Sequence, residues 1–524
     1  MKQVLYTKEA RDRVSDGINK VADAVKLTLG PGGGNAILEN QYGLVVTNDG
    51  FSIARDMEFE DQFENLGAKL IRQVAEKTDS VAKGGRTTAV TIAQELIKEG
   101  RKYIETGMNP VKIRAGMNLA LKDVIDQIKK SSWKINPGAE VVQVATISSE
   151  SKETGELVSK VLDKISKDGV VTVEGSNSTD TTFEVVNGYQ FDKGFISPYF
   201  APQGEAVLDD CLVLISDRKI TNGKESVEFL DKILKSGEKN ILIICEDLTD
   251  QALATFVVNK MQGVINVIAV KSPEWGDWRK KVLEDLAIIT GTVVLSEANG
   301  GTLENIGVEN LGRMKKVVVT KDKTTLIGNV GTNKDIFNRI VVLKEELSNE
   351  KDVVEKERLQ NRIGKLGAGV AVIHVGGSSE AEIVYKRQKT EDGVNDARSA
   401  LEEGVVLGGG VALATLKLSG KHKDRDIQAG YDIVKQSLSV QLKQISENAG
   451  ASPDVVLSEV LKGQGYDAKE DEYCDMRKRG ILDSAKVTRL VIQNAVSVAS
   501  ICLTVAVAIA DISKESITAS GQKL

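Results

Sequence analysis

Three glycine clusters and three aspartates are the parts of this sequence whose residue types suit phosphate chemistry. The glycines stand at residues 30–34, 84–85 and 408–410, each beside a helical pattern. Backbone N–H groups and the helix dipole at such places can hold phosphate oxygens. One cluster alone is weak support, because turns and helix caps also use glycine, but three together favour a nucleotide site. The chain has no GxxxxGKS or GxxxxGKT motif, which excludes a P-loop NTPase.

Asp49, Asp392 and Asp483 lie near these glycines, and their carboxylates could bind a divalent metal or activate water. Asp49 belongs to the turn sequence TNDG, Asp392 belongs to TEDG, and Asp483 follows GIL. Each one alone is more often a turn residue or a helix N-cap than a catalytic group. Sequence spacing does not bring the three together, so both interpretations stay open at this point.

The elements that must position these residues begin with helices at both ends of the chain. Apolar residues recur at helical spacing in the first third, and the part after about Gly404 is helical again. Residues 35–38 and 44–47 predict two short strands, joined by the turn residues Tyr42 and Gly43.

The middle of the chain follows another pattern. Residues 240–245 and 264–270 predict strands on either side of a helix at 249–261, which is a βαβ unit with a parallel sheet. Residues 335–365 predict an amphipathic helical hairpin, since apolar residues recur among many charges. We therefore expect a helical domain built from both chain ends, with an α/β part inserted between them.

The composition limits the function classes. The 524 residues include 69 Lys and Arg against 75 Asp and Glu, a formal net charge of -6, so no basic field attracts nucleic acid. The four cysteines form no CxxC pair and the two histidines lie far apart, so neither a disulfide framework nor a zinc site is expected. The N-terminus lacks the apolar core of an export signal, and we expect a cytoplasmic protein.

Residues 490–510 raise a membrane question, because they carry no formal charge and are long enough to span a bilayer. Gln493, Asn494 and several hydroxyl residues interrupt the stretch. We expect a buried helix and no membrane span, since spanning helices are usually more apolar than this.

Six motifs together identify a family. They are TLGP at 28–31, TNDG at 47–50, EDQFENLGA at 60–68, GMNP at 107–110, EEGVV at 402–406 and GILD at 480–483. In this order and spacing the sequence resembles group I chaperonins of the bacterial GroEL type. The resemblance covers essentially the whole chain.

The resemblance implies a multidomain α/β fold. A mostly helical equatorial domain would take residues 1–130 and 403–524, a small intermediate hinge domain 131–187 and 370–402, and an apical α/β domain 188–369. The family forms heptameric rings, usually stacked in pairs. The implied partners are non-native polypeptides and a 10 kDa-type co-chaperonin lid, with no nucleic acid and no membrane. The implied function is ATP-dependent folding of these polypeptides inside the ring cavity.

The resemblance also implies the cofactors ATP and Mg²⁺, with K⁺ as a further candidate. Asp49 and Asp392 match the family's hydrolytic and metal-binding carboxylates, so an ATPase is expected. The positions that match the family's nucleotide contacts are Thr28, Leu29, Gly30, Pro31, Gly84, Gly85, Arg86, Thr87, Thr88, Ile147, Ser148, Gly409 and Asp483.

A second set of residues matches the apical surface that binds substrate and co-chaperonin. In a monomer the helical stripes within this set would simply be core. With the resemblance, a groove between two helices suits apolar binding that tolerates many sequences. The set is Phe195, Tyr199, Phe200, Val227, Leu230, Leu253, Val257 and Val258.

The sequence departs from the family at the phosphate loop. The family's GDGTTT is KGGRTT at residues 83–88, so Gly84 stands where a metal-binding Asp is usual and Arg86 adds a cation. Asp79 is expected to be the only nearby carboxylate that could substitute, after a shift of the loop. These changes should weaken metal binding. The alternative function is therefore a chaperonin-like holdase or scaffold with impaired ATP hydrolysis, although the intact Asp49 and Asp392 favour the ATPase.

Overall fold

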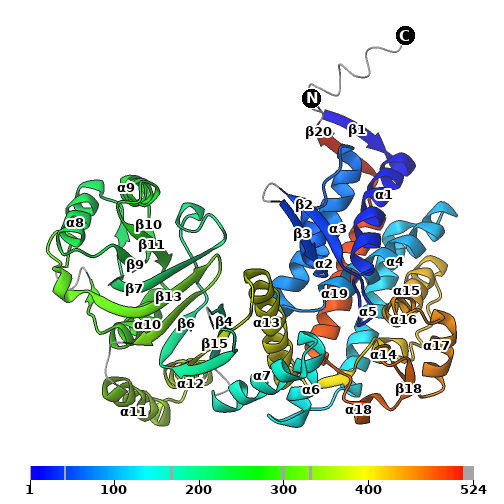
Figure 1. The fold of residues 1–524 in the computed structure, drawn as a ribbon. Helices are drawn as coiled ribbons and strands as arrows, with labels where there is room; N and C mark the ends of the chain where they lie inside the picture. Colours follow the sequence, from blue (N-terminus) through cyan, green and yellow to red (C-terminus); the bar gives the residue numbers. More distant parts are fainter. Residues whose placement is uncertain are drawn as a thin grey trace. The chain divides into compact units, whose positions relative to one another are not determined.

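The computed structural model describes residues 2–40, 43–165, 169–176, 178–296, 301–329 and 333–511. The chain divides into two compact units, one formed by Met1–Lys160 and Gln388–Leu524 and the other by Val161–Arg387. The first is mostly helical and is called the helical unit below, and the second is called the α/β unit (Figure 1). A helical part made of both chain ends with an α/β part inserted between them is what the sequence predicts. The finer three-domain boundaries stay a prediction.

The helical unit consists of long helices from both ends of the chain. Two helices, α7 (Lys152–Lys164) and α13 (Glu380–Glu403), contribute residues to both units. The other helices are α1 (Thr7–Lys26), α2 (Gly50–Asp56), α3 (Gln62–Ala82), α4 (Arg86–Glu105), α5 (Pro110–Ser131), α6 (Ala139–Ser149), α14 (Val411–Ala414), α15 (Arg425–Ser437), α16 (Val440–Asn448), α17 (Pro453–Leu461), α18 (Met476–Arg479) and α19 (Ala485–Leu503).

Helix packing in this unit depends on glycines at the crossing points. A Cβ on Gly17 of α1 would lie 1.8 Å from the carbonyl oxygen of Glu64 in α3, and one on Gly67 would lie 1.9 Å from that of Val14. Any side chain at either position would therefore push the two helices apart. The apolar face of α1 is buried at the predicted helical spacing, including Val14 and Ile18.

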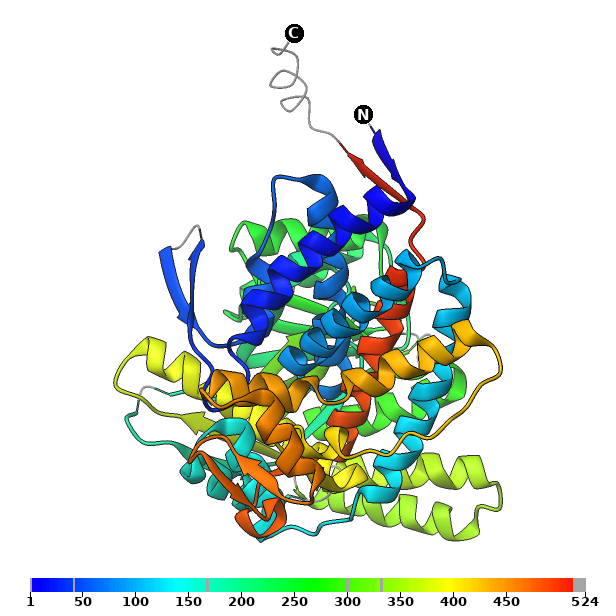
Figure 2. The same cartoon turned by 90° about the vertical axis from the view of Figure 1, so that its right-hand side faces the viewer.

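Helix α19 forms the centre of the helical unit, where it packs against α3, α4 and α5 (Figure 2). Of the helices that the structure describes, it alone is long and apolar enough to cross a membrane, and 67% of its most apolar window is buried inside the unit. The predicted buried helix is thus confirmed, but it ends at Leu503 and not near residue 510. The chain continues into the strand β20 (Val507–Asp511), which pairs antiparallel with β1 (Lys2–Tyr6).

Short antiparallel sheets complete the helical unit. The strands β2 (Ala36–Asn40) and β3 (Gly43–Thr47) form the predicted hairpin, although Tyr42 of its turn lies outside the described residues. Two further pairs are β16 (Val405–Leu407) with β19 (Leu482–Ser484), and β17 (Gly465–Asp467) with β18 (Glu472–Cys474).

The α/β unit is built on a seven-stranded sheet in the order β11-β9-β7-β13-β14-β6, with β12 pairing β7. The predicted βαβ unit is confirmed, because the parallel neighbours β9 and β11 are joined by α9. A separate sheet has the order β4-β15-β5. The strands are β4 (Val170–Gly175), β5 (Thr182–Val186), β6 (Gly188–Phe191), β7 (Glu205–Ser216), β8 (Lys219–Ile220), β9 (Asn240–Cys245), β10 (Asp247–Leu248), β11 (Asn266–Lys271), β12 (Val294–Leu295), β13 (Gly312–Thr320), β14 (Thr324–Asn329) and β15 (Val370–Val375).

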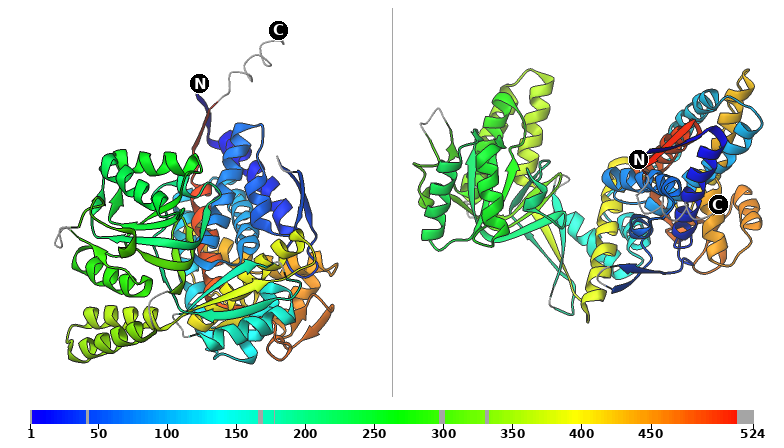
Figure 3. Two further views of the ribbon diagram at one scale, coloured as in Figure 1. Left: turned by 60° about the vertical axis from the view of Figure 1, so that its left-hand side comes forward. Right: turned by 90° about the horizontal axis from the view of Figure 1, so that it is seen from above.

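Five helices accompany these sheets: α8 (Gly223–Lys235), α9 (Asp250–Met261), α10 (Gly276–Thr290), α11 (Asn333–Asn349) and α12 (Val353–Gly367). The predicted helical hairpin is confirmed as α11 and α12, which lie side by side and antiparallel (Figure 3). Asp285 of α10 is fully buried and receives hydrogen bonds from Arg339 of α11 at 2.7 Å and from Arg362 of α12 at 2.7 and 2.9 Å. This charged cluster ties the hairpin to α10.

Candidate functional site

The helical unit gathers its candidate residues around the N-termini of α2 and α4. Asp49 is the N-cap of α2, and its carboxylate accepts hydrogen bonds from the backbone N–H of Ser52 at 2.9 Å and from the Ser52 hydroxyl at 2.7 Å. Asp49 therefore has the helix-capping role that its turn sequence indicates. One carboxylate oxygen, Oδ1, also faces the side chain of Arg86, so the cap is part of a larger charged site.

Arg86 begins α4, and its guanidinium joins three carboxylates from separate elements. Its Nη1 donates to Asp79 of α3 at 2.7 Å. Its Nη2 lies 3.1 Å from Oδ1 of Asp392 in α13 and 3.4 Å from Oδ1 of Asp49. We call this group of Arg86, Asp49, Asp79 and Asp392 the arginine cluster. It brings the two predicted hydrolytic carboxylates, which are 343 positions apart, onto one cation.

Burial and charge set the proton affinities of the arginine cluster. Burial raises the pKa of Asp392 to about 7, while Asp396 and Asp49 add to that shift and Arg86 opposes it. Burial also acts to raise the pKa of Asp49, but Arg86 and the hydrogen bonds from Ser52 and Phe51 outweigh it and lower that pKa. One carboxyl group of the pair is therefore ionised at neutral pH, and the other titrates near neutrality.

A fourth carboxylate, Asp396 of α13, lies one helical turn after Asp392 and directly over Gly84. A Cβ placed on Gly84 would lie 2.4 Å from Oδ1 of Asp396. Oδ2 of Asp396 accepts a hydrogen bond from Ser148 of α6, whereas the buried Oδ1 has no hydrogen-bond partner. Burial raises the pKa of Asp396 to about 6, with Ser148 opposing the shift and Asp483 adding to it.

The third glycine cluster and Asp483 meet through the β16–β19 pair, in which Val406 lies opposite Asp483. A Cβ on Gly408 would lie 3.0 Å from Oδ1 of Asp483, and Gly409 and Gly410 both have positive φ. A side chain at any of these positions would be crowded or strained. Burial raises the pKa of Asp483 to about 6. The sequence places Asp483 correctly beside this glycine turn.

The glycine loop after α1 is fastened by Asn448, the final residue of α16. Its side-chain amide donates to the carbonyl oxygens of Lys26 at 2.9 Å and Leu29 at 2.8 Å. A Cβ on Gly32 would lie 2.5 Å from the Asn448 carbonyl oxygen, so the loop and the end of α16 are in close contact. The predicted residues Thr28, Leu29, Gly30 and Pro31 therefore stand in a loop of fixed shape.

Close packing at Gly50 joins this loop region to the arginine cluster. A Cβ on Gly50 would lie 2.4 Å from Oγ1 of Thr87 and 2.9 Å from Cγ1 of Val25, which is three residues before Thr28. Thr88 is buried, and Ile147, beside Ser148, is exposed. Gly85 has a φ of +73° and a Cβ there would lie 2.5 Å from Val491 of α19, so only glycine fits before α4.

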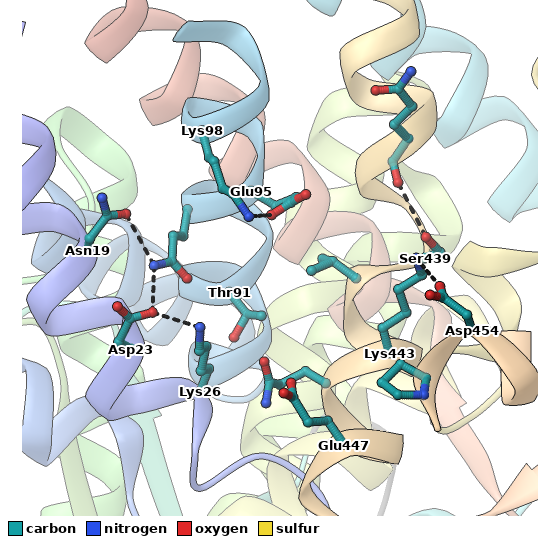
Figure 4. Close-up of a pocket in the computed structure, with 15 residues that line it drawn as sticks. Asn19, Asp23, Lys26, Thr91, Glu95, Lys98, Ser439, Lys443, Glu447 and Asp454 are labelled. Carbon is teal, nitrogen blue, oxygen red and sulfur yellow. Dashed lines mark hydrogen bonds and ion pairs between the residues drawn. The ribbon is translucent and has the colours of Figure 1, made fainter. Parts of the chain in front are cut away.

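A separate polar cavity of about 590 Å³ lies between α1, α4, α16 and α17 (Figure 4). Its three lysines are already paired: Lys26 with Asp23 at 2.7 Å, Lys98 with Glu95 at 3.8 Å, and Lys443 with Asp454 at 2.8 Å. None of the predicted nucleotide residues lines it. The lysines of this cavity are therefore neutralised by acidic residues of its own lining, and the cavity is distinct from the arginine cluster.

The predicted apolar surface of the α/β unit is only partly exposed. Tyr199, Val227 and Val258 are exposed, at 62%, 54% and 48%. Phe200 and Leu230 are buried in the core of the α/β unit, so in this structure they are not available at its surface to contact a substrate. The remaining members, Phe195, Leu253 and Val257, are partly buried and pack against that core.

Sequence reasoning missed Asp396. It proposed Asp79 as the only carboxylate near Gly84 that could substitute, but Asp79 binds Arg86 and Lys83 instead. A signal was present, because residues four apart on a helix share a face and Asp392 was already a candidate. What the sequence could not supply was the packing of α13 against Gly84, which lies 312 positions earlier.

The described residues contain no group of three or more His, Cys, Asp and Glu side chains that could hold a metal ion alone. Mg²⁺ in nucleotide sites commonly needs only one or two carboxylates, because phosphates and water complete its shell. The unpartnered oxygen of Asp396, which lies over Gly84, fits such a partial site.

Comparison with known proteins agrees with this architecture. Two crystal structures of the chaperonin gp146 from the bacteriophage EL 2 (Pseudomonas aeruginosa), in the presence of ATP-BeFx, match with TM-scores of 0.69 and 0.63. Both are 20% identical to this chain, and the matches cover 97% of this chain and 99% of theirs. They confirm the predicted multidomain fold. Residues 21–512 match the model of the TCP-1/cpn60 chaperonin family, and the chain therefore belongs to that family.

Proposed function

We propose that this chaperonin is a group I, bacterial-type member that binds ATP in its helical unit and couples ATP hydrolysis to the folding of non-native polypeptides. The observation that carries the proposal is the convergence of Asp49 and Asp392 on one cation beside the glycines of residues 84–85. Asp483 and the turn at 408–410 adjoin the same region through Asp396. Phosphate-binding loops and acidic residues are thus supplied together, as nucleotide hydrolysis requires.

In this proposal the nucleotide lies over the N-terminus of α4, with the loop at residues 28–31 and the Gly408–Gly410 turn on its other sides. The backbone of residues 84–88 and the α4 dipole would hold phosphate oxygens. Asp483 would bind the ribose, and Ser148 would lie near the phosphates. A bound Mg²⁺ would neutralise phosphate charge, and K⁺ is a further candidate cation.

Asp392 is the group that we assign to activating water. Its raised pKa, about 7, is matched to taking up a proton near neutral pH. Asp49, whose pKa is lowered, would stay ionised and orient the water or the metal. Before either can act, each must exchange its contact with Arg86 for water or a metal ion, and the guanidinium would then turn toward the phosphate charge.

Arg86 also supports a second candidate function, a holdase or scaffold with impaired hydrolysis. The guanidinium contacts both hydrolytic carboxylates and is anchored by Asp79 at 2.7 Å. A cation held in this way competes with a divalent metal for the same oxygens. If this contact persists when nucleotide is bound, ATP would bind without turnover.

The exposed apolar residues of the α/β unit would hold unfolded chains and the mobile loop of a lid protein. Tyr199 and Val227 are exposed; Val227 belongs to α8, which packs beside α9, and the short turn that carries Tyr199 also contacts α9. A groove between two helices is a common way to bind apolar segments of varied sequence. We further propose heptameric, stacked rings, a 10 kDa-type co-chaperonin and a cytoplasmic location.

The test is ATP hydrolysis by the purified protein with and without Mg²⁺, alongside Arg86→Thr. The same preparations would be assayed for recovery of a denatured test enzyme, with and without a 10 kDa-type co-chaperonin. Mg²⁺-dependent turnover with ATP-dependent recovery supports the folding machine. ATP binding without turnover, together with turnover in Arg86→Thr, supports the holdase. A protein that binds no ATP contradicts both.

A further inference from the structure

The relation between Gly84 and Asp396 is not an ordinary glycine contact. A Cβ on Gly84 would lie 2.4 Å from Oδ1, 3.2 Å from Cγ and 3.3 Å from Oδ2 of Asp396, so the whole carboxylate lies over the glycine. The carboxylate thus fills the volume that a side chain at position 84 would occupy. The absence of a side chain at residue 84 and the presence of a carboxylate at residue 396 depend on each other.

Asp396 is also only half satisfied. Ser148 binds its Oδ2, but the buried Oδ1 has no hydrogen-bond partner. An unpaired buried carboxylate oxygen is costly, and a catalytic role or a bound water or ion is among the reasons why native structures retain one. This oxygen points to the start of α4, where the backbone and helix dipole suit phosphate.

The other three carboxylates of the region already contact the guanidinium of Arg86. Asp79 holds Nη1 of Arg86, and Asp49 and Asp392 contact its Nη2. Among the described residues, Asp396 is the one of these four carboxylates with a buried oxygen that has no hydrogen-bond partner. A divalent cation that enters with nucleotide would meet this oxygen without first displacing Arg86.

We propose that Asp396 is a divalent-cation ligand that reaches the phosphate site from α13, in the position that a side chain of residue 84 would otherwise take. The proposal rests on the proposed nucleotide function, because the nucleotide phosphates supply the remaining ligands. Hard oxygen ligands such as a carboxylate suit Mg²⁺ and Mn²⁺, and one or two of them suffice beside phosphates. Ser148 is the positioning residue that fixes the orientation of the carboxylate.

This arrangement means that the carboxylate can be moved from residue 396 to residue 84 only if both residues are changed together. Gly84→Asp alone would place two carboxylates in the same volume, with steric overlap and charge repulsion, and should not improve metal binding. Gly84→Asp combined with Asp396→Ala removes the overlap and restores one carboxylate from the other side. The double variant should therefore bind metal better than either single variant.

The experiment measures binding of Mn²⁺ to the full-length protein in the presence of saturating ADP, by electron paramagnetic resonance. ADP binding itself is followed separately by the fluorescence of its N-methylanthraniloyl derivative with and without metal. The variants are Asp396→Asn, Gly84→Asp and Gly84→Asp with Asp396→Ala. The matched charge control is Asp454→Asn, an 86% exposed aspartate of the same unit. Circular dichroism establishes that each variant is folded.

We expect Asp396→Asn to weaken Mn²⁺ binding by at least about tenfold, since loss of outer-shell partners alone costs 10–100-fold. The double variant should recover most of this loss, and Asp454→Asn should match the wild type. Unchanged Mn²⁺ affinity in folded Asp396→Asn, with ADP still bound, overturns this inference alone. Failure of the wild type to bind ADP at any metal concentration overturns the proposed function and the inference with it.

Discussion

Nη2 of Arg86 lies 3.1 Å from Oδ1 of Asp392, so a residue at the start of α4 neutralises a carboxylate that follows it by 306 positions. The same nitrogen reaches Asp49 at 3.4 Å. A protein-borne cation therefore stands where the two predicted hydrolytic groups meet. Metal binding and hydrolysis at this site therefore depend on whether the Arg86 guanidinium keeps its contacts with Asp49 and Asp392 when nucleotide binds.

Arg86→Met should destabilise the helical unit, because it removes the charge shared by three carboxylates while keeping much of the side-chain volume. We expect a loss of about 3 kcal/mol in the free energy of unfolding without metal. Mg²⁺ should return part of this stability, since it can replace the lost positive charge. Thermal melting with and without Mg²⁺ measures both effects. Arg479→Met, at a half-exposed ion pair, is the control, and equal metal responses in the two variants would contradict the prediction.

The pKa of about 7 at Asp392 predicts a pH dependence of turnover. If Asp392 accepts the proton from water, ATP hydrolysis should rise as the pH increases toward 7 and level off above it. Asp392→Asn should abolish turnover while leaving ADP binding in place. A rate profile measured from pH 5.5 to 8.5 checks this, and a flat wild-type profile would show that another group limits the reaction.

The same carboxyls predict how stability changes with pH. Their folded pKa values, about 7 for Asp392 and about 6 for Asp396 and Asp483, lie above the ordinary value of 3.8. The stability they contribute is therefore fully present below about pH 4 and is lost as the pH rises through 6 to 7. Urea unfolding of the wild type and of Asp483→Asn at pH 5 and 8 should show a smaller pH effect in the variant. An equal effect in both would exclude Asp483 as a contributor.

Asn448→Ala should loosen the glycine loop after α1, because it removes two hydrogen bonds to the carbonyl groups of Lys26 and Leu29. Two neutral hydrogen bonds are worth about 1–2 kcal/mol, so ADP affinity should fall roughly tenfold. Titration with fluorescent ADP measures the change. Asn349→Ala, at an exposed helix end in the other unit, should have no effect on it.

Val227→Ser and Val258→Ser together should reduce the capture of unfolded protein. Both side chains are exposed and apolar, so the variant loses contact surface without losing core packing. Binding of a chemically denatured, labelled protein measures the effect. Val455→Ser changes a 56% exposed valine of the helical unit and serves as the control. Equal capture by all three proteins would place the substrate surface elsewhere.

The sequence predicts the elements well where a single repeating pattern governs them. The βαβ unit and the α11–α12 hairpin follow from apolar spacing alone, and the buried character of α19 follows from its polar interruptions. The end of α19 is placed too late, because the strand β20 continues the same apolar composition and only its pairing with β1 distinguishes it.

The sequence predicts the candidate site only at residues that lie in local turn motifs. Asp49 caps a helix and Asp483 borders a glycine turn, and both are visible in short motifs. The role of Arg86 as a bridge and the position of Asp396 over Gly84 arise from α13 packing on the start of α4. No pattern in either segment encodes that meeting, since it depends on the fold of the whole helical unit.

The central place of α19 has a consequence for synthesis on the ribosome. Helices α3, α4 and α5 emerge early, yet α19, the apolar partner they share, begins about 350 to 400 residues later in the chain. The inserted α/β unit has its own core and can fold while the helical unit is still incomplete. During its own synthesis, this member of the chaperonin family therefore exposes the apolar faces of α3, α4 and α5 until α19 has been made.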